Sequence, residues 1–192
     1  GFSLLTGGYL FYLAKTTNVK DLQNALKATT IIYDKNGDQA GSLTGQKGTY
    51  VELDAISKNL QNAVVATEDR SFYKNSGINY GRFFLAILTL GRSGGGSTIT
   101  QQLAKNAYLS QDQTVERKAK EFFLALEINK KYSKKEILTM YLNNAYFGNG
   151  VWGIEDASKK YFGVSASQLS LDQSAVLAGM LKGPEIYNPL YS

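Results

Sequence analysis

The sequence predicts a mainly α-helical (α+β) fold with a small β-hairpin near the N-terminus. From residue 53 onward, apolar residues recur at the three- and four-residue spacing of a helix. Ser133 with Glu136, and Ser170 with Gln173, match the capping box that opens helices. An Asn-Gly pair at residues 36–37, which is a strong hairpin signal, follows a short β-branched run. These three observations predict a helical domain behind a small β element.

Residues 1–14 form an apolar, uncharged stretch that ends before Lys15. The stretch is shorter than the ~20 apolar residues that span a bilayer. It can be interpreted as a core helix, or as the outer half of a truncated membrane anchor with Tyr9 and Tyr12 near the lipid interface. We expect the second, and assign residues 1–15 to a partial transmembrane anchor.

Residues 16–49 are expected to form a stalk that carries the β element. A short helix is predicted over residues 19–28, and residues 29–43 follow as the one clear β segment. The main domain is then expected over residues 50–192. A chain of 192 residues with 43% hydrophobic content can bury one good core.

Two stretches of the main domain are predicted to be helical, and each is expected to have a different role. The first should deliver Glu68 at its end and carries an apolar stripe made of Leu53, Ile56, Leu60 and Val64. The second stretch, residues 83–90, is continuously apolar and is expected to be buried.

A third helix, predicted over residues 114–129, has two distinct faces when its residues are placed at about 100° each. Arg117, Lys118 and Glu121 lie together on one face. Spacing alone favours an ordinary solvated face with an ion pair, and a substrate-binding face is the alternative. The other face should turn to the core and carries Val115, Ala119, Phe122, Phe123 and Leu126.

A glycine run at residues 94–96 leads into a predicted helix start with two hydroxyl residues, Ser97 and Thr98. Backbone N–H groups at the positive end of a helix favour an oxyanion, and Lys105 would add a full charge. Ser97 stands where a P-loop needs lysine, so this is a different motif. The turn indicates a site for phosphate or diphosphate.

Composition restricts the chemistry that is available. The chain contains no histidine and no cysteine, which excludes Ser-His-Asp and Cys-His systems, zinc sites built on imidazole or thiolate, and disulfides. Acid–base work must fall to carboxylates, lysine or tyrosine. The net charge of +5 favours an anionic lipid surface or a phosphorylated substrate. We expect no nucleic-acid partner, because no binding signature accompanies the charge.

Five ordered motifs resemble the signatures of the bacterial peptidoglycan glycosyltransferases (family 51). These enzymes occur as monofunctional transglycosylases and as the first domain of bifunctional class A penicillin-binding proteins. Gly-Gly-Ser-Thr-Ile-Thr-Gln-Gln at residues 95–102 resembles their second signature. The other four look similar to residues 68–77, 117–121, 137–148 and 177–189. Two residues depart from the family pattern: Asn75 stands where histidine is usual, and Thr139 where glutamate is usual.

The resemblance implies a lysozyme-like fold and the polymerisation of lipid II into β-1,4 glycan, with inversion and release of undecaprenyl diphosphate. Glu68 matches the catalytic glutamate. Glu121 is the second expected catalytic residue, and would either orient the cations or hold a divalent metal such as Mg²⁺ or Mn²⁺, although no cofactor is required. Asp69 is expected to shape the site through hydrogen bonds. The residues expected at the substrate are Asp69, Ser97, Thr98, Gln101, Gln102, Lys105, Arg117 and Lys118.

The implied partners are lipid II, the growing glycan chain, the bacterial membrane, and proteins of cell-wall synthesis and division. The implied location is the extracytoplasmic face of the cell membrane, behind a single-pass anchor. Phe72 and Tyr73 are interpreted as packing residues. Sugar stacking or core packing is open for three further aromatic residues, Tyr141, Tyr146 and Trp152.

Two alternatives of other classes remain. A lysozyme-like glycan hydrolase would share the lone glutamate, but would not need the basic helix face. A non-catalytic, membrane-tethered module that binds lipid diphosphates would keep the cations and would not need Glu68.

Overall fold

The computed structural model describes residues 8, 9, 11, 12, 15–27, 48–88, 97–108 and 115–182. The prediction of a mainly α-helical fold is confirmed. The helices are α2 (Leu22–Lys27), α3 (Lys58–Glu68), α4 (Tyr80–Leu88), α5 (Ile99–Tyr108), α6 (Val115–Lys131), α7 (Lys134–Asn144), α8 (Ile154–Phe162) and α9 (Leu171–Met180), with 3-10 turns at Leu53–Ala55 and Ala166–Gln168. Within the described ranges, the β pairing is a single bridge between Tyr146 and Trp152. The hairpin predicted over residues 29–43 lies outside them.

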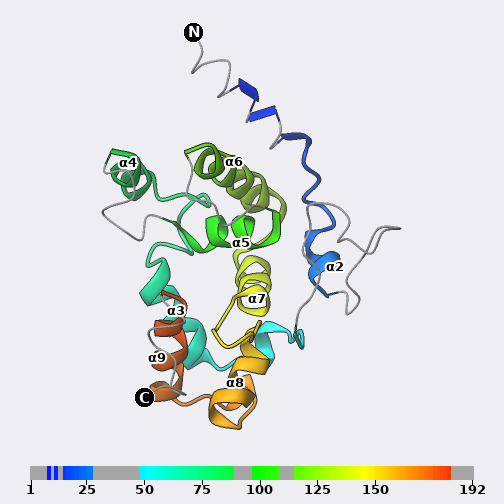
Figure 1. Cartoon of the computed structure of the whole chain (residues 1–192), viewed down its shortest axis with the longest axis vertical. Helices are drawn as coiled ribbons and strands as arrows, with labels where there is room; N and C mark the ends of the chain where they lie inside the picture. Colours follow the sequence, from blue (N-terminus) through cyan, green and yellow to red (C-terminus); the bar gives the residue numbers. More distant parts are fainter. Residues whose placement is uncertain are drawn as a thin grey trace.

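Helix α5 occupies the centre of the fold and positions the site. It packs against α6 on one side and α7 on the other, while α3 and α9 lie side by side (Figure 1). The side chains of α5 that fill these contacts include Ile99 and Leu103, which are fully buried. Its N-terminal end therefore meets residues from α6 and from the end of α3.

The helix boundaries follow the local signals in the sequence. Ser133 accepts a hydrogen bond from the Glu136 N–H at 3.1 Å, and the Glu136 carboxylate accepts one from the Ser133 N–H at 3.0 Å. Ser170 and Gln173 form the same reciprocal pair, so both predicted capping boxes are confirmed. Helix α3 ends at Glu68 as predicted, but it begins at Lys58, so Leu53 and Ile56 of the expected apolar stripe lie before it, in and after a 3-10 turn. Helix α2 is shorter than the predicted range of 19–28.

The expectation that residues 83–90 are buried is wrong for the side chains that are described. Phe84, Leu85 and Leu88 are 58%, 52% and 81% exposed. Helix α4 stands apart from the other helices in Figure 1, and its described ring contact is that of Tyr80 with Phe122, at a centroid distance of 6.1 Å. Continuous apolarity cannot distinguish a core helix from one whose apolar side chains remain exposed.

Across the described part of the chain, no helix is long and apolar enough to cross a membrane.

The most buried face of helix α6 is the charged one and not the predicted apolar one. Ala119, Phe122, Phe123 and Leu126 are only partly buried, although Phe123 packs against the main core and Phe122 and Leu126 pack against a small cluster of Ile78 and Ala125. The residues that face the interior, by contrast, are Arg117, Glu121, Leu124, Ala125 and Ile128. The charged face is buried because its residues pair with one another and with the start of α5, so burial leaves no isolated charge.

Candidate active site

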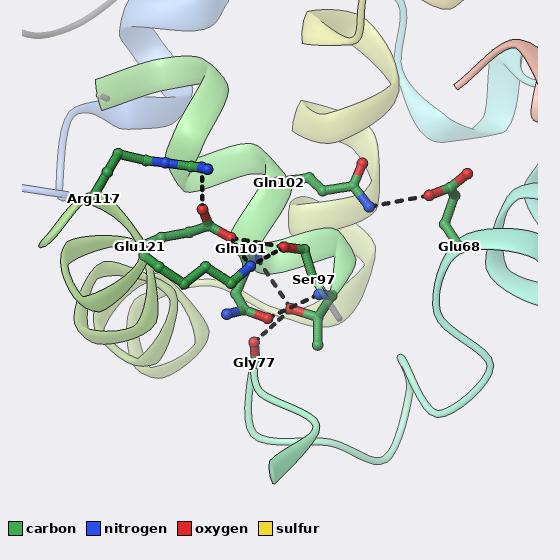
Figure 2. A network of polar contacts seen from close by, with 9 residues as sticks. Glu68, Gly77, Ser97, Gln101, Gln102, Arg117 and Glu121 are labelled. Atoms are coloured by element: carbon green, nitrogen blue, oxygen red, sulfur yellow. Dashed lines mark hydrogen bonds and ion pairs between the residues drawn. The ribbon is translucent and has the colours of Figure 1, made fainter. Parts of the chain in front are cut away.

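Glu68 lies at the last position of α3, half-buried. Its Oε2 atom accepts a hydrogen bond from Gln102 Nε2 at 3.1 Å, as drawn at the right of Figure 2. Its Oε1 atom is buried and has no hydrogen-bond partner among the described residues. Burial raises the pKa of Glu68, while the Gln102 hydrogen bond and the charges of Lys182, Arg82 and Lys105 act in the opposite direction. Glu68 therefore has one oxygen held by Gln102 and one oxygen that no described residue holds.

Asp69, the next residue, is enclosed by donors. It is 2% exposed and accepts hydrogen bonds from Asn75 Nδ2, at 3.1 and 3.2 Å, and from the backbone N–H of Ile99, at 3.2 Å. The Ile99 bond ties the end of α3 to the first residue of α5. The expected shaping role through hydrogen bonds is thus visible, whereas contact of Asp69 with substrate stays a prediction.

Asn75 is a junction that the sequence did not reveal as such. Its Nδ2 donates to Asp69. Its Oδ1 accepts hydrogen bonds from the Gly77 N–H at 3.0 Å and from Lys134 Nζ at 3.1 Å. An amide can donate and accept at once at every pH, so asparagine links a carboxylate and an ammonium group without titrating. Among the described residues, the hydroxyl of Thr139, the second departure from the family pattern, bonds within its own helix, to the Lys135 carbonyl at 2.7 Å.

Glu121 is the centre of a second polar cluster, at the left of Figure 2. It is fully buried. Arg117 donates to its Oε2 at 2.5 Å, and Lys118 donates to its Oε1 at 3.0 Å. Ser97 donates to Oε1 at 2.9 Å and accepts a hydrogen bond from Lys118. The solvated-face interpretation of α6 is therefore wrong, because the network anchors two cations at the start of α5.

This cluster does not fit a divalent metal at Glu121. Both carboxylate oxygens already accept charge-assisted hydrogen bonds from cations, and Mg²⁺ or Mn²⁺ would need those lone pairs and would be repelled by the same cations. Nor do the described residues contain a group of three or more potential metal-ligating side chains.

Lys105, on α5, interacts electrostatically with both glutamates. It is half-buried and has no hydrogen bond or ion pair to the described residues. Burial lowers the pKa of Lys105; Glu121 and Glu68 oppose this, while Arg117 and Lys118 add to it. A cation without a bonded partner in such a place favours an added anion.

Thr98 and Gln101 open α5. The Gln101 N–H donates to Thr98 Oγ1 at 3.1 Å, and the Thr98 N–H donates to Gln101 Oε1 at 2.9 Å. Thr98 also donates to the Gly77 carbonyl at 2.6 Å. Both side chains are buried, so they cap the helix and fix the loop before it. Their contact with substrate stays a prediction.

The aromatic residues divide between packing and the surface. Tyr141 is 1% exposed, which excludes it from sugar stacking. Tyr146 and Trp152 are partly exposed, with ring centroids 4.8 Å apart. Phe72 packs in the core as predicted, whereas Tyr73, which was expected to pack, is 51% exposed.

This arrangement agrees with comparison to known proteins. The family model described as transglycosylase matches residues 36–192. The chain belongs to the transglycosylase family. The two glutamates and the start of α5 all lie within the matched transglycosylase region.

The relatives of this transglycosylase are penicillin-binding proteins. It is 82% identical to penicillin-binding protein 2a of Streptococcus pneumoniae over 98% of the chain and 26% of the relative. It is 45% identical to penicillin-binding protein 1A of Aquifex aeolicus over 83% of the chain and 23% of the relative. Penicillin-binding protein 1A/1B of Bacillus subtilis is 39% identical over 97% of the chain and 21% of the relative. The chain thus spans about a quarter of these relatives' length.

Proposed function

We propose that this transglycosylase polymerises lipid II into a β-1,4 glycan strand and releases undecaprenyl diphosphate. The observation that carries the proposal is the pairing of one carboxylate that has an unbonded oxygen, Glu68, with a separate cationic set on α5 and α6. A sugar diphosphate already has a good leaving group. It needs a base for the incoming hydroxyl and cations for the departing charge.

In the proposed reaction, the Glu68 carboxylate accepts the proton of the 4-hydroxyl of the acceptor N-acetylglucosamine. That oxygen attacks the anomeric carbon of the donor N-acetylmuramic acid, and the bond from this carbon to the diphosphate oxygen breaks. The new bond forms on the opposite face, so the α-linked donor gives a β linkage. The negative charge that develops on the diphosphate is received by Lys105, Arg117 and Lys118.

Glu121 would hold the cations in place, because its oxygens bond Arg117 and Lys118. Ser97 bonds to both Glu121 and Lys118, and its hydroxyl at the glycine turn would bind a phosphate oxygen of the substrate. Gln102 would support Glu68 from its other side. We assign catalysis to Glu68 and the orientation of the cations to Glu121, with no metal at this carboxylate.

The wider setting is also a proposal. We assign residues 50–192 to the catalytic domain, residues 16–49 to a stalk and residues 1–15 to a partial anchor. The protein would work at the extracytoplasmic face of the bacterial membrane on a single-pass anchor, next to the growing glycan chain and to proteins of cell-wall synthesis and division.

Incubation of the chain with purified lipid II in detergent tests the proposal. We expect a polymer that lysozyme digests, together with released undecaprenyl diphosphate. A glycan hydrolase would instead shorten a polymer that is supplied ready-made. A binding module would retain lipid II on the protein and leave it unchanged. Either of these last two results contradicts the proposal.

A further inference from the structure

Two uncharged side chains, Tyr141 and Gln102, form a chain of hydrogen bonds that ends at Glu68. Tyr141, from α7, donates its hydroxyl hydrogen to Gln102 Oε1 at 2.8 Å. Gln102, from α5, donates from Nε2 to Glu68 Oε2 at 3.1 Å. Tyr141 is fully enclosed, so its hydroxyl cannot exchange this contact for water. The chain of two bonds runs from the core to the carboxylate (the Gln102–Glu68 part is drawn in Figure 2).

We infer that Tyr141 and Gln102 are positioning residues, which together hold the Glu68 carboxylate in its ionised, proton-accepting state. The inference rests on the proposed role of Glu68 as the base. Neither residue contacts the reacting atoms in this scheme. Tyr141 acts through Gln102, and Gln102 acts through Glu68.

The direction of the two hydrogen bonds supplies the physical reason. The carboxyl hydrogen of a protonated Glu68 could form a hydrogen bond to Gln102 Oε1. For this, the Gln102 amide would have to rotate so that its oxygen and its NH₂ group exchange positions. The turned amide would donate to the Tyr141 oxygen, and the hydroxyl hydrogen of Tyr141 would then lose its acceptor. A buried donor without an acceptor is unfavourable. The tyrosine hydroxyl therefore fixes the amide with its N–H groups toward Glu68, and an N–H donor favours the carboxylate.

The hydroxyl of Tyr141 stays a donor. Burial and the negative charges of Glu68 and Asp69 raise the pKa of Tyr141 far above its ordinary value. The hydroxyl therefore keeps its proton at neutral pH.

The remaining charges around Glu68 come from several elements. Arg82 on α4, Lys105 on α5 and Lys182 after α9 all lower the pKa of Glu68. Arg82 and Lys182 are exposed, so salt screens their effect. The Gln102 bond is partly buried and is screened less. It is the contribution that opposes burial most directly.

Three variants test the inference: Tyr141→Phe, Gln102→Met, and the two combined. Tyr132→Phe is the matched control, because it also removes a tyrosine hydroxyl that bonds inside the protein, to the Val19 and Lys20 carbonyls. The first measurement is the titration of the Glu68 side-chain carboxyl by carbon-13 NMR, with its resonance assigned from Glu68→Gln. This measurement needs no substrate, so it stands even if lipid II is not polymerised.

We expect the Glu68 titration to move to higher pH in Tyr141→Phe and further in Gln102→Met. The double variant should match Gln102→Met, because Tyr141 acts only through the amide. The control should titrate like the unchanged chain. Equal titrations in all variants, or a further shift in the double variant, would overturn the inference. Tyr141→Phe alone decides the matter if Gln102→Met does not fold.

The second measurement is the pH profile of kcat/KM with lipid II. A base must be ionised, so its acid limb should move to higher pH along with the Glu68 titration. On the acid side, we expect Gln102→Met to lower kcat/KM about tenfold, the effect of one hydrogen bond to a charged group. A uniform loss at every pH would indicate a merely structural role and overturn the inference. Absence of polymer with the unchanged chain would instead contradict the proposed function alone.

Discussion

Glu68 and Glu121 are the two glutamates of the site, and they differ in almost every physical respect. Glu68 is half-buried, has a single hydrogen-bond donor and keeps Oε1 without a partner. Glu121 is fully buried and has both oxygens bonded to cations. A carboxylate with an unbonded oxygen can take a proton, whereas one saturated by Arg117 and Lys118 can only hold its partners. Glu68 is therefore suited to proton transfer, whereas Glu121 is suited to holding Arg117 and Lys118 in place.

The comparison is tested first at Glu68. Replacing Glu68 with Gln should reduce lipid II polymerisation by about 10²–10⁴-fold, the contribution of a general base. The amide keeps the shape and the contact with Gln102, so the thermal midpoint and lipid II binding should stay close to those of the unchanged chain. Turnover and Tm are the measurements. Activity above about a tenth of the original would remove Glu68 from the role of base.

The same change at Glu121 should act on stability. Glu121→Gln leaves Arg117 and Lys118 without their negative partner, and breaking a buried ion pair costs about 3 kcal/mol. Glu116→Gln is the control on the same helix, because Glu116 forms only an exposed pair with Lys120 and should change the free energy of unfolding by less than about 0.5 kcal/mol. Denaturant unfolding measures both. Equal effects would show that burial of Glu121 carries no energetic weight.

Lys105 interacts electrostatically with both glutamates, so its removal tests a third part of the candidate site. Lys105→Met should lower kcat and kcat/KM together by about 10²-fold if the cation acts on the departing diphosphate. Stability should be unchanged or higher, because burial already lowers the pKa of Lys105. A rise in KM with unchanged kcat would instead place Lys105 in ground-state binding.

The smallest expected effect is a pH-dependent gain in stability from Glu68→Gln. The folded-state pKa of Glu68 lies above its unfolded value, since burial raises it. Folding therefore favours the protonated form, and the carboxylate destabilises the protein increasingly as pH rises through the folded-state pKa. The variant should be more stable than the unchanged chain at pH 7 and equal to it below pH 4. Unfolding curves at both pH values measure this, and an equal gain at both would contradict burial as the cause.

Local signals in the sequence determined the helix starts and indicated the candidate site residues. Ser133 and Ser170 cap their helices as predicted, because a capping box needs only residues three positions apart. The spacing of Arg117 and Glu121 likewise implied their pairing, since residues four apart meet on one helix face. The motifs around Glu68 and Ser97 likewise indicated the candidate site without any tertiary contact.

Only the tertiary structure decided which faces are buried and which residues support the site. Phe84 and Leu88 are exposed, whereas Glu121 is enclosed, because burial depends on what packs against a helix and not on its composition. Tyr141 on α7 reaches Gln102 on α5, and Lys134 on α7 reaches Asn75 before α4. Contacts between residues so distant in the chain leave no periodic pattern in the sequence from which they could be predicted.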